Sequence, residues 1–466
     1  MKKLLTLLLL VAFGVSSDAA LESQVQSLIQ EADPSLIVGI EVQTLEGEKP
    51  ILSFQAERPY VTASTQKILP VSVAFSTLTD TSFATEFHYD AKNDESYLIF
   101  NGDPLLTLKD LTHIIGKAKA KGMLGKKIYI LKSHPQEGAA LPPTSPGCTY
   151  EAMDFCHGGV FSTAIVNQNR ALFDFDGNST TGKALVNLHE GQPPFAVKND
   201  TFVRDICFNN EKVGKWDQVQ RTALDFNGVK ISIKGCTSRD FKATMCLPVQ
   251  AHDLDRYLRF VIQTALKNNH VSLPIEFADT MEGNCTKKFQ YTSSTLLKLL
   301  KLSLQDSHNL TTDALFSKVT QKKEWPRNWT FAGKTLMEKM HDLFGVTFDV
   351  HDEISSGSGF SFYNRLMPKT FIQILRKTRK KLGDKFLEIF PEAGVNGTIK
   401  NRLKDLQGVR ILGKTGHLNG VSNFVGYIER EGKEPLVFAI FVQGFAVDPK
   451  VRRGLIDDVI KLVASV

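Results

Sequence analysis

The chain has 466 residues, of which 42% are hydrophobic and 23% are charged, and its formal net charge is +6. This length exceeds what one compact core can hold, so we expect two or three domains of an ordinary globular protein. Basic residues are scattered, and their densest run, residues 376–381, lacks the interleaved aromatic residues of a nucleic-acid-binding surface. We therefore expect no nucleic acid partner.

The first residues are typical of a secretory signal peptide. Lys2 and Lys3 precede an apolar run over residues 4–15, and Ser17-Asp18-Ala19 is a small-x-small cleavage site. The apolar run is too short to span a membrane comfortably, and no later stretch is long and apolar enough. We expect residues 1–19 to be removed and the mature chain to be exported, with no transmembrane span.

The mature chain begins with a predicted helix over residues 21–31, followed by predicted strands over residues 36–44 and 51–55. A second helix is expected to begin near Ser64-Thr65-Gln66-Lys67. The three-residue spacing places Ser64 and Lys67 on one face of that helix.

Ser64 and Lys67 can form a nucleophile without a histidine, because a neutral lysine can accept the proton of the serine hydroxyl. The apolar residues that follow, over 68–75, predict a helix that is buried on most sides. Burial suits this chemistry, since desolvation lowers the pKa of a lysine.

Residues 83–285 are expected to form a β-rich insertion, with two nested domains. Short predicted strands at 97–100 and 127–131 alternate with glycine and proline turns, and residues 225–234 read as a hairpin around an Asn-Gly pair. Helices are expected at 252–268 and 292–304.

All six cysteines fall within this middle region, and an even number in an exported chain is typical of structural disulfides. Their fifteen pairings stay open; the cysteines are Cys148, Cys156, Cys207, Cys236, Cys246 and Cys285. No spacing has the C-x-x-C form of a zinc site, and no H-E-x-x-H motif occurs, so no metal site is predicted.

From residue 292 onward the pattern returns to mixed helices and strands. Helices flank Ser307-His308-Asn309, and glycine-rich loops are expected at 355–361 and 391–398. A strand over 409–412 runs into Lys414-Thr415-Gly416. Further antiparallel strands and a last amphipathic helix are predicted at 421–428, 436–442 and 453–466.

The three motifs S-x-x-K, S-x-N and K-T-G occur in the order found in penicillin-recognising enzymes. A K-T-G strand edge can pair with an extended peptide, while lysine and threonine bind a terminal carboxylate. Each motif alone is weak, since roughly one or two S-x-x-K matches arise by chance in a chain of this length. The ordered triple is much more specific.

Over essentially the whole mature chain, these motifs resemble the D-alanyl-D-alanine carboxypeptidase/endopeptidases, which are class C low-molecular-mass penicillin-binding proteins of the penicillin-binding protein 4 type. The matching segments are T-A-S-T-Q-K (62–67), G-D-P (102–104), S-G-S-G-F-S (356–361), G-V-N-G-T (394–398) and G-K-T-G (413–416).

The resemblance implies an α/β (α+β) fold, a serine β-lactamase/transpeptidase-like domain with an antiparallel sheet and helices. Residues 20–82 and 286–466 would form this domain, interrupted by the insertion at 83–285. It further implies a periplasmic serine DD-peptidase that acts on peptidoglycan stem peptides, is inhibited covalently by β-lactam antibiotics and needs no cofactor.

The resemblance also implies roles for the catalytic residues. Ser64 attacks the carbonyl between two D-amino acids, and Lys67, kept neutral by burial and by Lys414, is the general base. Ser307 relays the proton to the leaving amine. Asn309 holds the substrate amide and Lys67.

Substrate contacts are implied in the same way. Lys414 and Thr415, with Gly416, form the K-T-G edge that binds the terminal carboxylate. The backbone N–H groups of Ser64 and His417 would form the oxyanion hole.

Three residues depart from the family pattern, and Phe362 is the one that concerns stem recognition. Ser356 replaces an aspartate, and Phe362 stands where an arginine associated with the stem commonly follows. His308 replaces the aspartate of S-D-N, and its side chain is expected to point away from the site. Asp154 lies in the segment where the family places an acidic stem contact, although a surface aspartate explains it equally well.

Two alternatives remain. A serine β-lactamase shares the motifs, but it usually lacks an insertion of this size and needs a fast deacylation base that the sequence does not reveal. A weakly catalytic peptidoglycan-binding scaffold is the second, which the intact motif residues argue against.

Overall fold

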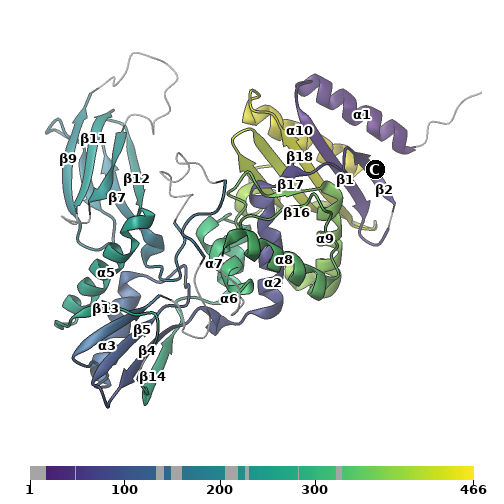
Figure 1. Ribbon diagram of the computed structural model, residues 1–466. Coiled ribbons are helices and arrows are strands. Elements are labelled where there is room, and N and C mark those ends of the chain that lie inside the picture. Colours follow the sequence, from purple (N-terminus) through teal and green to yellow (C-terminus); the bar gives the residue numbers. More distant parts are fainter. Residues whose placement is uncertain are drawn as a thin grey trace, which may run out of the picture.

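The computed structural model describes residues 17–47, 49–132, 141–147, 160–204, 219–225, 230–281, 283–321 and 328–465. Figure 1 shows a body of helices and sheet at the right and a β-rich region that extends to the left. The first and last parts of the chain both belong to the right-hand body, and the middle of the chain forms the left-hand region.

A five-stranded antiparallel sheet unites the two ends of the chain. Its order is β16-β17-β18-β1-β2, so β16 lies at one edge of the described sheet. The strands predicted from the sequence are confirmed: β1 (Ile37–Thr44), β2 (Pro50–Phe54), β16 (Val409–Leu418), β17 (Val421–Arg430) and β18 (Leu436–Gln443).

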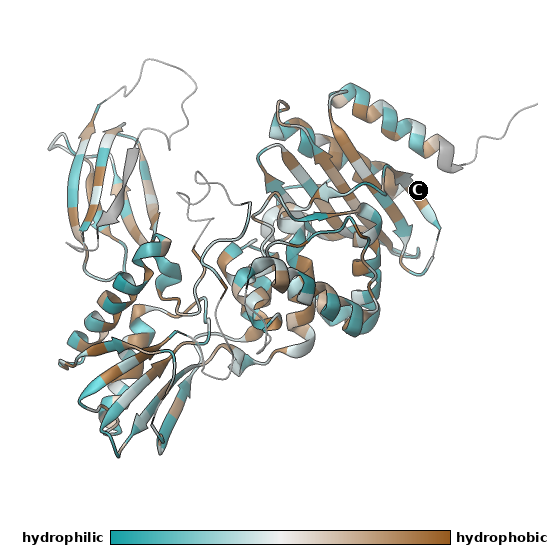
Figure 2. Cartoon of the chain, viewed as in Figure 1, coloured by the Kyte–Doolittle hydropathy of each residue, from teal (hydrophilic) through white to brown (hydrophobic). Residues whose placement is uncertain are grey.

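This sheet is buried on both faces, as its hydrophobic strands require. Side chains alternate along β18: Phe438 and Ile440 pack with one cluster of core residues, and Val437 and Phe441 pack with another. The first cluster lies under the terminal helices α1 (Ser17–Ala32) and α10 (Pro449–Ser465), which pack against each other. Figure 2 shows the hydrophobic residues along these strands.

The other face of the sheet is covered by helices that surround α2. Residues Ile68 to Ala74 of α2 are all buried, which confirms the helix predicted to be enclosed on most sides. The helices are α2 (Ile68–Thr77), α6 (Leu296–Leu304), α7 (Asn309–Val319), α8 (Trp329–Phe344) and α9 (Pro368–Leu382). Pro70 lies in the first turn of α2, where a missing N–H is tolerated.

The middle of the chain contains a second five-stranded sheet, with the order β13-β6-β5-β4-β14. Its strands are β4 (Thr85–Asp90), β5 (Glu95–Ile99), β6 (Lys127–Leu131), β13 (Ile275–Phe277) and β14 (Lys287–Tyr291); α3 (Leu108–Ala120) and α5 (Leu254–Asn268) pack with it. Because β14 pairs with β4, the sheet continues past residue 285, where the sequence placed the end of the insertion.

Two three-stranded sheets complete the middle region, with the orders β10-β11-β9 and β12-β7-β8. Their strands are β7 (Arg170–Asp176), β8 (Leu185–Leu188), β9 (Ala196–Val203), β10 (Val219–Asp225), β11 (Lys230–Thr237) and β12 (Lys242–Pro248). The antiparallel pairing of β10 with β11 confirms the predicted hairpin, whose Asn-Gly turn lies outside the described residues.

The cysteines differ in part from the expectation of complete pairing. Cys236 and Cys246 are disulfide-bonded. Cys285 is a free cysteine whose Sγ lies 3.5 Å from Sδ of Met281, so the prediction that all six cysteines form bridges is wrong for this residue. The other three cysteines lie outside the described residues.

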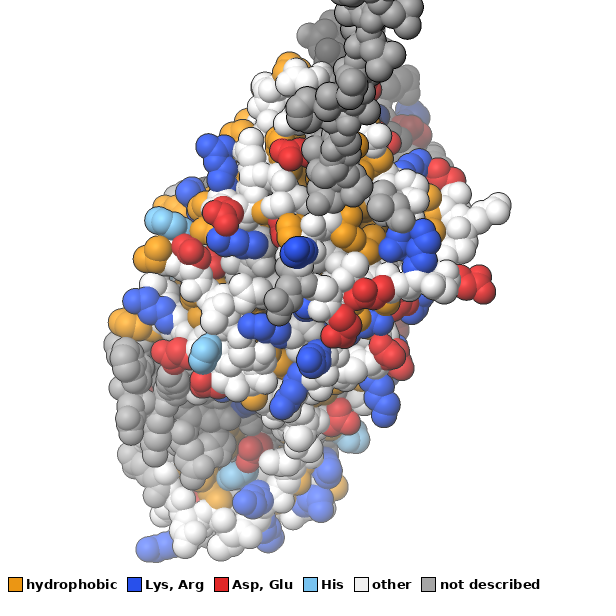
Figure 3. All heavy atoms as spheres, turned by 90° about the vertical axis from the view of Figure 1, so that its right-hand side faces the viewer, with side chains coloured by type: hydrophobic (Ala, Val, Ile, Leu, Met, Phe, Trp, Pro, Cys, Tyr) orange, Lys and Arg blue, Asp and Glu red, His pale blue; other side chains and the backbone are white. Residues whose placement is uncertain are grey.

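The surface carries interspersed charges. Figure 3 shows Lys and Arg side chains mixed with Asp and Glu on the face that lies at the right of Figure 1, in keeping with their scatter along the sequence. Within the described parts of the chain, the helices are all too short or too polar to cross a membrane.

Candidate active site

Ser64 lies in a short 3-10 turn, η1 (Ala63–Lys67), that leads into α2. In a 3-10 turn, side chains three positions apart lie directly above one another. Nζ of Lys67 accordingly donates a hydrogen bond to Oγ of Ser64 at 2.8 Å. Ser64 is half-buried, whereas the other four residues of the turn are buried. The hydroxyl of Ser64 is thus the accessible group of this turn.

The backbone before Ser64 is held in a constrained geometry. Ala63 has a φ of 46°, in the left-handed region that non-glycine residues rarely adopt. Nδ2 of Asn423, on β17, donates to the carbonyls of Val61 and Thr62 at 2.8 and 2.9 Å. These two hydrogen bonds fix the backbone just before the strained Ala63. A strained conformation persists in a folded protein only when its surroundings hold it in this way.

Lys67 is fully buried and has three oxygen partners. Besides Ser64, Nζ donates to Oδ1 of Asn309 at 2.6 Å and to the carbonyl of Ser358 at 2.5 Å. A neutral amine can keep the bonds to Asn309 and Ser358 with its two hydrogens, while its lone pair accepts the proton of Ser64. The site therefore accommodates both protonation states of Lys67 without leaving a buried partner unsatisfied.

The pKa of Lys67 is lowered to about 7, chiefly because burial penalises the ammonium form, while Asp313 acts in the opposite direction. Asp313 lies on α7, one turn after Asn309, and its Oδ1 accepts from the N–H of Ser358 at 2.8 Å. Burial raises the pKa of Asp313 to about 6, partly offset by its hydrogen bonds to Ser358 and by Lys67. Sequence reasoning missed Asp313, although its four-residue spacing from Asn309 was a usable signal.

Ser307 and Lys414 form a second hydrogen-bonded pair. Nζ of Lys414 donates to Oγ of Ser307 at 2.9 Å and to the carbonyl of Thr415 at 2.8 Å. Lys414 is fully buried, and burial together with the nearby charge of Lys67 holds its pKa well below the ordinary value. The repulsion between these two ammonium groups is mutual, so their proximity disfavours a state in which both are charged.

Ser307 itself has a φ of 57°, which is a second strained position at this site. The following His308 caps α7: its Nδ1 accepts from the backbone N–H of Thr311 at 3.2 Å. Its Nε2 lies 3.0 Å from Oε1 of Gln168. The His308 ring therefore points away from the two lysines, as expected.

The K-T-G residues lie on the edge strand β16, against η1. A Cβ on Gly416 would lie 2.7 Å from the carbonyl oxygen of Thr62 and 3.1 Å from Cβ of Ala63, so a side chain there would push the strand away from Ser64. Oγ1 of Thr415 shares a hydrogen bond of 2.9 Å with Oγ1 of Thr398. Thr398 was not predicted as a site residue, although it belongs to the G-V-N-G-T segment.

The glycine-serine loop at 355–361 packs against the η1 turn. A Cβ on Gly359 would lie 1.9 Å from the Ala63 carbonyl oxygen, so the loop can approach the η1 turn only with glycine at this position. This approach delivers the Ser358 carbonyl to Lys67. The loop thereby supplies a lysine partner that the motifs did not indicate.

The two residues predicted to contact a stem peptide have different outcomes. Phe362 is half-buried, and its ring stacks on that of Phe445 with a centroid distance of 6.4 Å. Phe445 is 71% exposed and packs over Gly420, in the turn between β16 and β17. Asp154 lies outside the described residues.

Ser64, Lys67 and Asn309 form one hydrogen-bonded group, and Ser307 and Lys414 form another. Among the described residues, no group of three or more His, Cys, Asp or Glu side chains could hold a metal ion.

Comparison with known proteins gives a family match over most of the chain. The model of the D-Ala-D-Ala carboxypeptidase 3 (S13) family matches residues 21–466. The chain is 27% identical, over 469 residues, to the D-alanyl-D-alanine carboxypeptidase DacB of Haemophilus influenzae, covering 94% of this chain and 91% of that protein.

Two solved structures are similar in fold. Penicillin binding protein 4 (dacB) from Haemophilus influenzae has a TM-score of 0.76 and 21% identity, covering 94% of this chain and 99% of that chain. The same protein complexed with a β-lactam has a TM-score of 0.71 and 22% identity, covering 93% and 98%. These matches confirm the fold class predicted from the sequence.

Proposed function

This chain belongs to the D-Ala-D-Ala carboxypeptidase 3 (S13) family and is a serine-type DD-peptidase, and from this premise we propose that Ser64 is its nucleophile and Lys67 its general base. The observation that carries the proposal is the bond of 2.8 Å between Nζ of Lys67 and Oγ of Ser64. It joins the half-buried hydroxyl to an amine whose pKa burial lowers to about 7.

In the acylation step, Ser64 transfers its proton to neutral Lys67 as Oγ attacks the carbonyl carbon between two D-amino acids. The C–N bond then breaks, and the leaving amine must receive a proton. Ser307, held by Lys414 at 2.9 Å, is the proposed relay for it. The products are an ester on Ser64 and a free amino acid or peptide.

Deacylation repeats these transfers with water in place of Ser64. Lys67 removes a proton from the water, the ester bond breaks, and the proton returns to Ser64. The Asp313 carboxylate stabilises the positive charge on Lys67, and so it favours the protonated lysine that forms in each half-reaction. Asp313 is a positioning residue, because it reaches the site through Ser358.

Charge that develops on the carbonyl oxygen requires hydrogen-bond donors in fixed positions. The backbone N–H groups of Ser64 and His417 are the proposed donors. Gly416 keeps the edge strand that carries His417 close to Ser64, and this close approach supports the assignment.

The substrate is proposed to lie along the edge of β16, as an added strand. Lys414 and Thr415 would bind its terminal carboxylate, and Asn309 would bind its amide. The stacked rings of Phe362 and Phe445 are a proposed apolar contact for the peptide stem.

We further propose that the chain acts on peptidoglycan stem peptides outside the cytoplasm, with residues 1–19 as the export signal and with β-lactams as covalent inhibitors of Ser64. The contact of Asp154 with the stem stays a prediction. For the domains, the catalytic part predicted at 20–82 and 286–466 is proposed here as 20–82 and 292–466, because β14 (Lys287–Tyr291) pairs with β4 of the insertion.

The proposal is tested by incubating the mature protein and a Ser64→Ala variant with a disaccharide-pentapeptide. The wild-type protein is expected to release one D-alanine, and the variant none above background. Release by the variant at the wild-type rate would refute Ser64 as the nucleophile. Circular dichroism of both proteins controls for folding.

A further inference from the structure

The insertion reaches the S-x-N motif through the side chain of Gln168. Oε1 of Gln168 lies 3.0 Å from Nε2 of His308, the central residue of that motif, although the two residues are 140 positions apart. Gln168 belongs to the short turn η4 (Asn167–Asn169). Both side chains are half-buried. A residue of the insertion therefore contacts a motif of the catalytic part.

The turn that carries Gln168 is strained. Asn167, Gln168 and Asn169 have φ values of 47°, 56° and 51°, so three consecutive residues other than glycine occupy the left-handed region. Asparagine tolerates this region, but glutamine does not share that preference. Strain of this kind concentrates at functional sites and is kept where the surrounding structure holds it.

Hydrogen bonds within the insertion hold the turn. Oδ1 of Asn167 accepts from the N–H of Leu108 at 3.0 Å. The carbonyl of Asn169 accepts from the N–H of Val249 at 2.9 Å. The two asparagines thus fix the backbone inside the insertion, while the side chain of Gln168 is directed at the catalytic part.

His308 transmits this contact to the start of α7. Its Nδ1 accepts from the N–H of Thr311, and a backbone N–H can only donate, so the neutral imidazole carries its proton on Nε2. That N–H donates to Oε1 of Gln168. The contact fixes both the tautomer and the orientation of the ring that caps α7.

The residues on either side of His308 make the proposed catalytic contacts. Oγ of Ser307 accepts from Lys414 at 2.9 Å, and Oδ1 of Asn309 accepts from Lys67 at 2.6 Å. Because α7 begins at Asn309, the cap fixes the place from which this side chain extends. A rotation of the His308 ring would release the cap and shift both neighbours.

We infer that Gln168 is a positioning residue for the DD-peptidase reaction. It holds the ring of His308, and the capped start of α7 then keeps Ser307 and Asn309 aligned with their lysine partners. This inference rests on the proposed function, in which Ser307 and Asn309 act. It also gives the β-rich insertion a part in catalysis.

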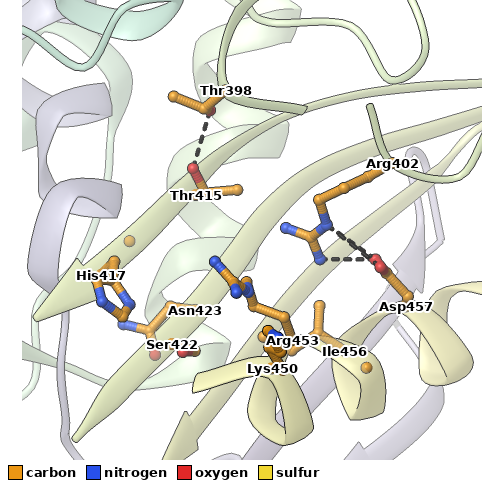
Figure 4. Close-up of a pocket in the computed structure, with 12 residues that line it drawn as sticks. Thr398, Arg402, Thr415, His417, Ser422, Asn423, Lys450, Arg453, Ile456 and Asp457 are labelled. Atoms are coloured by element: carbon orange, nitrogen blue, oxygen red, sulfur yellow. Dashed lines mark hydrogen bonds and ion pairs between the residues drawn. The ribbon is translucent and has the colours of Figure 1, made fainter. Parts of the chain in front are cut away.

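The carboxylate-binding side of the site is built differently. The cavity next to Thr415 is lined by residues between Thr398 and Asp457, all of which belong to the catalytic part (Figure 4). Loss of the Gln168 contact should therefore lower kcat and leave the preference for a free terminal carboxylate unchanged.

The test measures D-alanine release from the disaccharide-pentapeptide by the mature protein. Gln168→Asn shortens the side chain by one methylene, so that the amide no longer reaches His308, while asparagine suits the left-handed backbone. Its kcat should fall about tenfold, a part of the roughly hundredfold cost of misplacing a reacting group by about 1 Å, with KM little changed. Gln168→Gly, which also relieves the strained φ, should show the same loss, so a folding defect of one variant does not decide the outcome.

A second comparison separates positioning from a general effect on the fold. His308→Asn keeps a side chain that caps a helix but has no group in the place of Nε2. In this background, Gln168→Asn should cause no further loss, because the contact is already absent. An undiminished further loss would overturn the inference.

The matched control is Gln192→Asn, which shortens another glutamine of the insertion. Oε1 of Gln192 accepts from the N–H of Leu172 at 3.1 Å, so this variant also loses one hydrogen bond, and its kcat should stay at the wild-type value. Wild-type kcat in both Gln168 variants, or an equal loss in the control, would refute the role of Gln168. A wild-type protein that releases no D-alanine refutes the proposed function itself, which is a separate outcome.

Discussion

Lys67 and Asp313 are joined through one residue: Nζ of Lys67 donates to the carbonyl of Ser358 at 2.5 Å, and the N–H of Ser358 donates to Oδ1 of Asp313 at 2.8 Å. Lys67 is fully buried and Asp313 is partly buried, and each shifts the pKa of the other toward its charged form. The protonation state of the proposed base therefore depends on a carboxylate that does not touch it.

Acylation is expected to depend on pH with a midpoint near 7. The pKa of Lys67 is lowered to about 7 by burial, so the lysine becomes a competent base as the pH rises through that value. The rate of acylation by a chromogenic cephalosporin, measured from pH 5 to 9, should rise and then level off. A Lys67→Met variant should acylate about 10²- to 10⁴-fold more slowly, the usual loss on removing a general base. A rate that falls as the pH rises through 7 would contradict this.

The same shift affects stability. The folded protein holds Lys67 at a pKa of about 7, against 10.5 as the ordinary value, so the unfolded chain binds more protons between these limits. This group alone therefore makes the free energy of unfolding rise with pH from about 7 to about 10.5. The free energies of unfolding of the wild-type protein and of Lys67→Met are measured in urea at several pH values. Their difference should rise with pH over this range. A difference that does not change with pH would exclude a lowered pKa of Lys67.

Asp313→Asn is expected to move the acylation midpoint to lower pH. The carboxylate raises the pKa of Lys67 against the effect of burial, and the amide removes that charge while it can still accept from the Ser358 N–H. The measurement is the pH profile of acylation, with Asp306→Asn, an exposed carboxylate of the same region, as the control. An unchanged or higher midpoint would show that Asp313 has a structural role alone.

Gly416→Ala is expected to destabilise the protein by about 1 to 3 kcal/mol, the usual cost of overpacking, and to slow acylation. The new methyl group would meet the Thr62 carbonyl and Ala63, both held in the strained segment before Ser64. Gly454→Ala is the matched control, because nothing lies within 4 Å of its Cβ position on α10. Thermal unfolding and acylation kinetics of both variants check the prediction; equal stability of the two would refute the close contact.

Thr415→Val should lower kcat/KM for D-alanine release about 10- to 100-fold, since a hydrogen bond to a charged group is lost while the shape is kept. Thr415→Ser keeps the hydroxyl and should retain most of the activity. The loss should nearly vanish for a substrate whose terminal carboxylate is amidated. A loss of equal size for both substrates would place Thr415 outside carboxylate binding.

The sequence predicted the pairs that its motifs contain. Ser64 and Lys67 are neighbours within one turn, and K-T-G and S-x-N are local patterns on a strand and at a helix start. Their meeting in space could be expected because the order of the motifs matches the family. The central sheet was predictable for a similar reason: its strands are hydrophobic on both faces and are bounded by turns.

The parts that were missed depend on contacts between distant segments. Asp313 acts on Lys67 through Ser358, which lies 45 residues further along the chain. Asn423 donates hydrogen bonds to the carbonyls of Val61 and Thr62, which precede it by 362 and 361 positions. Cys285 was expected in a bridge because cysteine number was the only signal, yet it packs beside Met281 as a free thiol. Periodicity within one segment carries no information about such partners.

The measurement that tests the account most directly is mass spectrometry of the intact, oxidised protein after incubation with benzylpenicillin, followed by peptide mapping. A single penicilloyl adduct on Ser64, absent in Lys67→Met at short times and released slowly, is the predicted result. An adduct on another residue, or none on a folded protein that also leaves the disaccharide-pentapeptide intact, would contradict the assignment of Ser64 and Lys67.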